Sequence, residues 1–144
     1  MNDANRNNFI GEKYAFATTV KTAGEFEFTI THVAAADDVI TICGHDITWK
    51  TSGATGQQID IPASDTATKE AAALKAYLNA LTGTSGPAAY TWDNTGAKLE
   101  ATQKATALYA PDVTVSVSHS GGTATQTVSN VDVVKPNGSP KGAV

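Results

Sequence analysis

Hydrophobic and polar residues alternate in several short segments of the chain, the period of two that is typical of half-buried β-strands. Phe26, Phe28 and Ile30 alternate with acidic and hydroxyl residues, and the valines of residues 113–118 alternate with threonine and serine. Ser120-Gly121-Gly122 follows and predicts a turn, after which residues 123–128 can return antiparallel.

Two β-hairpins are predicted where apolar runs flank turn residues. The first joins residues 39–43 to 47–51 through Gly44-His45-Asp46, since glycine can supply the positive φ of a tight turn. The second joins residues 90–92 to 98–102 through Asp93-Asn94-Thr95-Gly96. Ile59 and Ile61 indicate a further short strand.

One helix is expected over about residues 66–82. Its apolar residues recur at spacings of three and four and therefore share a face: Ala67, Ala71, Leu74, Leu78 and Leu81. Ser64 or Asp65 can cap its start, because a side-chain oxygen can accept from the free N–H groups of the first turn. Gly83 can end it in a left-handed conformation. Tyr77 is expected to pack at the edge of the apolar face.

The order of strands, one helix and more strands predicts an α+β fold, a mostly antiparallel β-sheet or sandwich with one amphipathic helix. Residues 1–13 are rich in asparagine and are expected to form a flexible N-terminal arm. Residues 131–144 contain several prolines and glycines and are expected to form a flexible C-terminal tail. This leaves a single domain at residues 14–130, because 144 residues is the usual size of one domain.

Charge narrows the range of partners. The net charge is −4, Arg6 is the only arginine and the lysines are scattered, so no basic stripe is present to bind nucleic acid.

No apolar run approaches the roughly 20 residues that cross a bilayer. The polar N-terminus indicates no signal peptide, so we expect a soluble protein made in a cytoplasm. The 17% charged residues and abundant alanine, threonine and glycine suit a subunit in contact with its own copies, although a small secreted β-domain has the same composition.

The motifs of enzymes and metal sites are weak, so the sequence assigns no catalytic, cofactor-binding or metal-binding residues. Cys43 and His45, with Asp46 beside them, are the nearest approach to a metal cluster, but a zinc site needs three or four ligands. Cys43 is the only cysteine, which excludes an internal disulfide and leaves an inter-subunit one open. His119 with a serine and an aspartate could form a triad, as in most chains. Asp37 and Asp38 are interpreted as turn residues.

One succession of segments resembles a small module of tailed-bacteriophage virion proteins, including head-decoration and tail-associated subunits. It comprises the hairpin sequence VITICGHDITWK at residues 39–50, Ile59-Asp60-Ile61, the helix start DTATKEAAAL at residues 65–74, Tyr77-Leu78-Asn79 and Leu99-Glu100-Ala101-Thr102. The resemblance spans roughly residues 24–118 and consists of hydrophobicity and small residues, so it transfers no functional residue. It implies that the chain binds neighbouring capsid or tail subunits.

The sequence therefore predicts a virion structural protein rather than an enzyme. The expected function is that of a capsid decoration (cement) subunit, a homo-oligomer such as a trimer, which binds the major capsid protein and is assembled in the bacterial cytoplasm. Its terminal segments would order against neighbouring chains. A tail-tube or other tail subunit is the first alternative. A carbohydrate-binding or adhesion module that uses Trp49 or Trp92 is the second, and exposure of these tryptophans would favour it.

Overall fold

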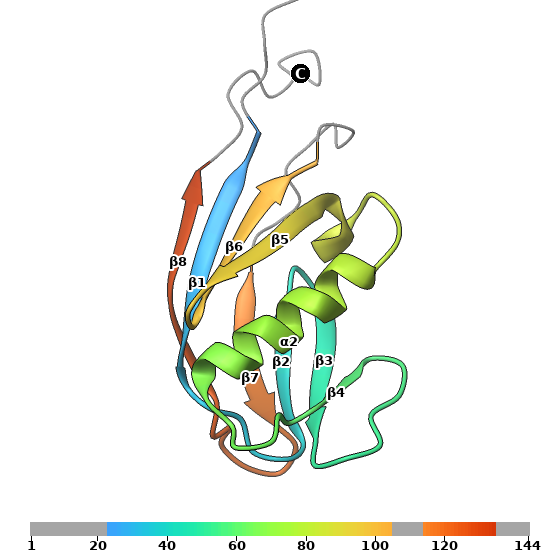
Figure 1. Cartoon of the computed structure of the whole chain (residues 1–144), viewed down its shortest axis with the longest axis vertical. Coiled ribbons are helices and arrows are strands. Elements are labelled where there is room, and N and C mark those ends of the chain that lie inside the picture. Colours follow the sequence, from blue (N-terminus) through green and yellow to red (C-terminus); the bar gives the residue numbers. More distant parts are fainter. Residues whose placement is uncertain (1–22, 105–113, 135–144) are drawn as a thin grey trace, which may run out of the picture.

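The computed structural model describes residues 23–104 and 114–134, and these residues form two facing β-sheets and one α-helix (Figure 1). In chain order the elements are β1 (Glu25–His32), β2 (Asp38–Ile42), β3 (His45–Lys50), β4 (Gln58–Asp60), α2 (Ala67–Ala80), the 3-10 turn η1 (Gly86–Ala89), β5 (Tyr90–Thr95), β6 (Lys98–Gln103), β7 (Val115–His119) and β8 (Thr127–Val134). The fold is α+β, as the sequence predicts.

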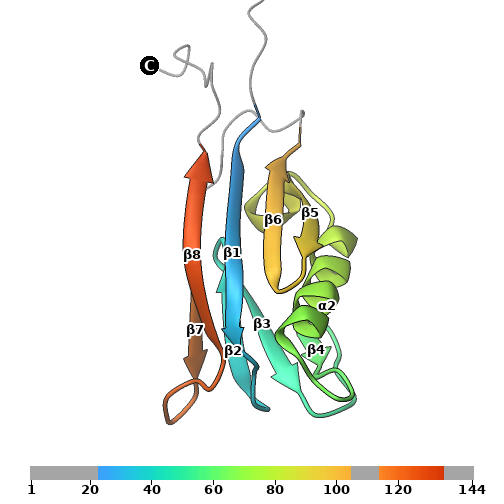
Figure 2. The same cartoon turned by 60° about the vertical axis from the view of Figure 1, so that its left-hand side comes forward.

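Each sheet contains four strands. Sheet A has the order β5-β6-β1-β8, and sheet B has the order β4-β3-β2-β7. All neighbouring strands are antiparallel except β3 and β4, which run parallel. Figure 2 shows the two sheets as separate layers, with α2 along one side of the sandwich and with β7 and β8 along the other.

The core lies between the sheets and under α2. The inward-facing side chains of β1 to β3 are at most 3% exposed, and they alternate with more exposed ones, which confirms the predicted period of two. Phe26 contacts Tyr90 and Trp92 in edge-to-face arrangements, with ring centroids 4.9 and 5.2 Å apart. Ala71, Leu74 and Leu78 of α2 are buried against this core, so the predicted apolar helix face is confirmed.

The helix ends differ from the prediction. Thr66 is the N-cap, and its hydroxyl accepts a hydrogen bond from the backbone N–H of Lys69 at 3.2 Å, so the caps predicted at Ser64 or Asp65 are wrong. At the other end, Leu81 is an extended C-cap whose N–H donates to the carbonyl of Leu78. Gly83 has the predicted positive φ of 112° but follows the cap in the loop.

Both predicted hairpins form, with tighter turns than expected. Ile42 pairs with His45, so the first turn is Cys43-Gly44 rather than residues 44–46, with φ values of 50° and 78°. Two consecutive positive φ values match the right-handed twist of the strands that the turn connects. In the second hairpin Thr95 pairs with Lys98, which leaves Gly96 and Ala97 in the turn.

The last strand departs most from the prediction. The valine strand forms as β7, but the returning strand β8 begins at Thr127 and pairs with β1 of the other sheet instead of β7. The boundary drawn at residue 130 falls inside β8, because Val133 and Val134 still pair with Phe26 and Glu25. The predicted arm at residues 1–13 and the rest of the tail lie outside the described residues.

Candidate functional site

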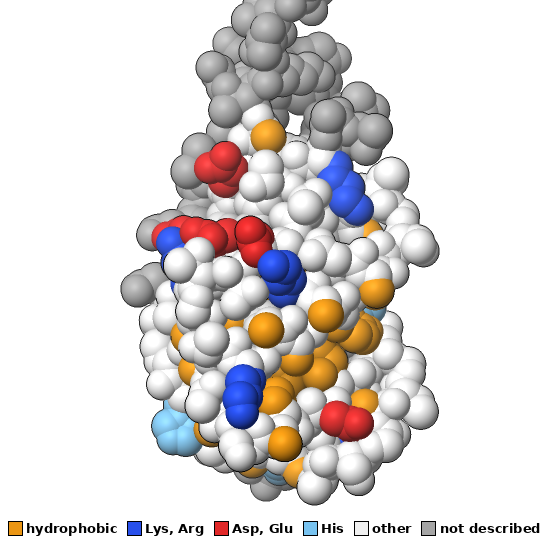
Figure 3. Space-filling view, viewed as in Figure 1, with side chains coloured by type: hydrophobic (Ala, Val, Ile, Leu, Met, Phe, Trp, Pro, Cys, Tyr) orange, Lys and Arg blue, Asp and Glu red, His pale blue; other side chains and the backbone are white. Residues whose placement is uncertain are grey.

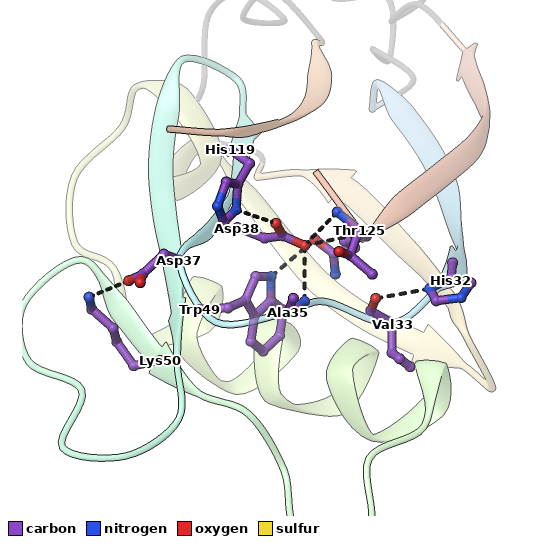
Figure 4. Close-up of polar contacts among 10 residues, drawn as sticks. His32, Val33, Ala35, Asp37, Asp38, Trp49, Lys50, His119 and Thr125 are labelled. Carbon is purple, nitrogen blue, oxygen red and sulfur yellow. Dashed lines mark hydrogen bonds and ion pairs between the residues drawn. The ribbon is translucent and has the colours of Figure 1, made fainter. Parts of the chain in front are cut away.

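Three connecting segments meet at one end of the sandwich: residues 33–37 after β1, residues 61–66 before α2, and residues 120–126 before β8. Three polar side chains there are almost completely buried, namely Asp38, Glu70 and Gln126. Figure 4 shows part of this group, with Asp38 in the middle of converging hydrogen bonds. Buried polar groups of this kind require partners, and these residues supply them to one another.

Asp38 joins two of these segments through its carboxylate. Its Oδ2 accepts hydrogen bonds from the backbone N–H groups of Ala35 at 3.0 Å, Thr125 at 3.0 Å and Gln126 at 2.8 Å. Its Oδ1 lies 2.8 Å from Nδ1 of His119, the last residue of β7. Burial alone raises the pKa of Asp38, but these hydrogen bonds together outweigh it, so the pKa lies below the ordinary value. Asp38 is therefore ionised at neutral pH.

Gln126 connects Asp38 to the helix. Its side-chain oxygen accepts from the indole Nε1 of Trp49 at 3.0 Å, and its Nε2 donates to Oε2 of Glu70 at 2.7 Å. The other oxygen of Glu70 accepts from the backbone N–H of Ala34 at 2.6 Å. A continuous chain of hydrogen bonds thus runs from β3 to the first turn of α2. It fixes the positions of the connecting segments relative to the core.

The pairing of His119 with Asp38 matches the orienting half of a catalytic triad, in which a buried carboxylate holds an imidazole through Nδ1. The imidazole is 30% exposed, so its other nitrogen can reach a ligand or solvent. A triad also requires a nucleophile within hydrogen-bond reach of that nitrogen. Among the hydrogen bonds of the described residues, none places a serine or a threonine there. The contacts that are present attach β7 to the start of β2.

The residues considered for a metal site do not converge. His45 Nε2 lies 3.0 Å from the Tyr77 hydroxyl on α2, whereas Asp46 is exposed and accepts a hydrogen bond from Thr41 at 2.7 Å. Cys43 occupies the turn, is half-buried and packs against the core. Burial raises the pKa of Tyr90 to about 12, and electrostatic repulsion from Cys43 adds to the rise. Among residues 23–104 and 114–134, no three acidic, histidine or cysteine side chains are close enough to hold a metal ion.

Both tryptophans belong to the core. Trp49 is 0% exposed and Trp92 is 2% exposed, and the indole N–H of Trp92 donates to the carbonyl of Pro87 at 2.9 Å. Neither ring is available to stack on a sugar in this conformation. The exposure of Trp49 and Trp92 that would favour a carbohydrate-binding module is therefore not observed.

The outer surface of sheet A carries a row of charges. Glu27, Glu100 and Asp93 occupy neighbouring register positions on β1, β6 and β5, beside a groove of about 420 Å³. Lys98 lies 3.0 Å from Glu27 and 2.9 Å from Glu100, and Lys75 of α2 lies 2.6 Å from Asp93. Figure 3 shows acidic and basic side chains next to one another beside α2. The lysines neutralise part of the row, which makes it a solvated, ion-paired surface.

Residue type alone does not reveal the buried network, which depends on the face that each side chain occupies. Asp38 has the type of a turn residue, yet it shares the inward face of β2 with Ile40 and Ile42. Glu70 lies four residues before Leu74, on the apolar face of the helix. The signal for both is an acidic residue at a position where the strand period of two, or the helix period of 3.6, calls for an apolar side chain.

Comparison of the chain with protein-family models, curated proteins and solved structures found no match. In the described part of the chain, no helix has the length and apolar character that a membrane span needs.

Proposed function

We propose that the protein is a structural subunit of a tailed-bacteriophage virion, most specifically a head-decoration subunit that stabilises the capsid by binding neighbouring chains. Two lines of reasoning support this proposal. One is the resemblance of residues 24–118 to virion modules, which rests on the order of the hairpin, the helix and the later strands. The other, which carries the proposal, is the difference between the two edges of sheet A.

The β5 edge of sheet A is closed by the helix. Asn79 of α2 donates its Nδ2 to the carbonyl of Trp92 at 2.8 Å and accepts from the Trp92 N–H at 2.9 Å. A side-chain amide thus forms the two hydrogen bonds that a further strand would form at this position. This edge is protected against pairing with another chain.

The β8 edge is different. β8 has eight residues and pairs with β1 on one side, and no other strand of the described residues pairs with its second side. An edge strand of this length presents a row of backbone donors and acceptors that a strand of a neighbouring chain can extend. The register between β1 and β8 shifts twice, so an incoming strand would have to follow the bends that these irregularities produce. We assign this edge as the main contact with sister or capsid subunits.

The alternative function, that of a tail-tube or other tail subunit, would use the same β8 edge but would bind tail subunits instead of capsid subunits. Purified full-length protein should be incubated with undecorated phage heads and, separately, with tail tubes, followed by sedimentation and native mass spectrometry. Binding to heads supports the decoration function, and binding to tubes supports the tail alternative. A chain that stays monomeric and binds neither particle would contradict the virion assignment.

Hydrogen exchange tests the contact itself. Backbone amides of β8 should exchange more slowly in the assembled particle than in the free subunit, because a neighbouring strand would bond the outer N–H groups. The β5 amide of Trp92 is the internal control, since Asn79 already bonds it in the single chain. Unchanged β8 exchange in a particle that does contain the protein would place the interface elsewhere.

A further inference from the structure

Two carboxyl groups lie together at the start of α2 without a basic partner. Both carboxylate oxygens of Asp65 are buried, and no N–H or hydroxyl group of the described residues donates to them, while the neighbouring charged group that acts on Glu70 is this same Asp65. Glu70 is completely buried, and both of its oxygens already accept hydrogen bonds, from Ala34 N–H and from Gln126 Nε2. An ionised carboxylate can only accept hydrogen bonds, so two ionised acids here would repel and would leave Asp65 unsatisfied.

We propose that Asp65 and Glu70 share a proton in the native protein, which Glu70 donates to the carboxylate of Asp65, so that the two acids form one hydrogen-bonded unit. A protonated carboxyl group has one donor and still has lone pairs to accept from Ala34 and Gln126. A single proton on the pair therefore removes the repulsion and gives Asp65 a hydrogen bond, while the bonds to Ala34 and Gln126 are kept. This inference is independent of the proposed virion function.

The environment of Glu70 favours the proton. Burial is the largest cause and raises its pKa, the Ala34 N–H opposes this rise, and the adjacent Asp65 carboxyl group and its charge add to it. Gln126 lowers the pKa, and the result is a pKa of about 7, against an ordinary value of 4.5. A carboxyl group beside a second carboxyl behaves in this way because the two cannot both ionise at low cost.

The other charged groups nearby are engaged elsewhere. Lys69, next to Glu70 in the helix, donates its Nζ to the carbonyls of Ala63 and Ser64 at 2.7 and 2.8 Å. Asp38 and His119 face each other on the far side of Gln126. Among the described residues, no lysine, arginine or histidine forms an ion pair with Asp65 or Glu70.

The proton makes the end of the sandwich sensitive to pH. Because the native pKa of Glu70 lies above its unfolded value, the stability it contributes is complete below pH 4.5 and is lost as the pH rises through about 7. Above that pH the repulsion between Asp65 and Glu70 acts on the bonds that Glu70 makes to residues 34 and 126. We expect the start of α2 to loosen from the connecting segments in this range.

The test is the pH dependence of unfolding in the full chain. Between pH 5 and pH 8 the unfolding constant of the wild type should rise by on the order of tenfold to a hundredfold from this group. Asp65→Asn should reduce this rise, because it removes the second negative charge and its amide can donate to an ionised Glu70, whereas the part that is due to burial should remain. Asp46→Asn is the matched control, since Asp46 is exposed and the amide oxygen can still accept from Thr41. It should retain the dependence of the wild type.

Carbon-13 NMR of the glutamate carboxyl groups reads the proton directly in the native state. Glu70 should titrate near pH 7 in the wild type and at a clearly lower pH in Asp65→Asn, although its burial should still hold the pKa above the ordinary value. Titration of Glu70 near its ordinary value in the folded wild type would overturn the proposal, even if a variant proved too unstable to study. A pH dependence of unfolding that is unchanged in Asp65→Asn would also overturn it.

Discussion

At the scale of single residues, two adjacent aspartates have opposite environments. Asp38 is 0% exposed and accepts bonds from three backbone N–H groups and faces His119. Asp37 is exposed and forms an ion pair with Lys50 at 2.6 Å. Removal of a buried acceptor leaves its donors unsatisfied, whereas an exposed ion pair is replaced by water. Asp38 therefore stabilises the fold, whereas the ion pair of Asp37 contributes little to the free energy of unfolding.

Asp38→Ala should lower the free energy of unfolding by about 3 kcal/mol or more, because several buried donors lose their acceptor. Asp38→Asn should cost less, since its oxygen can accept the three N–H bonds and its amide can donate to a neutral His119. Asp37→Asn is the control and should leave the urea midpoint nearly unchanged. Equal effects of the substitutions at residues 37 and 38 would contradict the buried position of Asp38.

The same carboxylate predicts sensitivity to acid. The native pKa of Asp38 lies below its unfolded value of 3.8, so its contribution is present above that pH and is lost as the pH falls through the native value. The wild type should therefore lose stability below about pH 4, and Asp38→Asn should lose less over the same range. Circular dichroism during acid titration measures this difference. A steeper acid loss in Asp38→Asn would argue against the depressed pKa.

At the scale of elements, α2 both covers the core and closes a sheet edge. Leu78 is 1% exposed and packs into the core, whereas Lys75, one turn earlier, is half-buried and its side chain forms an ion pair with the exposed Asp93. Leu78→Ala should lower the free energy of unfolding by about 2–5 kcal/mol, because a buried leucine leaves a cavity. Thermal unfolding should show a clearly lower melting temperature for Leu78→Ala and a nearly unchanged one for Lys75→Ala. Similar effects of the two would contradict the packing of this face.

Periodicity predicted the elements well, because alternation and helical spacing report directly which face is buried. It identified β1, β7 and the apolar face of α2 from residues such as Phe28, Val117 and Leu74. It could not give the partner of β8, since the choice between β7 and β1 depends on long-range packing and not on local sequence. The buried network could not be predicted for the same reason, because a carboxylate is stable in the protein core only when N–H groups from distant segments donate to it.

At the scale of the whole molecule, the C-terminal boundary of the fold can be tested with two truncations. Removal of residues 131–144 deletes the end of β8 and its pairs with Glu25, Phe26 and Glu27. Each lost backbone bond is worth about 0.5–1.5 kcal/mol, so the melting temperature should fall by several degrees. Removal of residues 135–144 spares β8 and should change it little. If the longer deletion leaves the melting temperature unchanged, the folded domain ends at residue 130.

The hydrogen bonds between Asn79 and Trp92 limit how copies of this protein can grow into larger objects. A chain whose sheet accepted strands on both sides could add copies head to tail without end, and such contacts build fibres rather than closed particles. Here a copy that contributed its β5 edge would find that edge already occupied by its own helix. Sheet A can therefore be continued in one direction only, and polymerisation through it stops after a single addition.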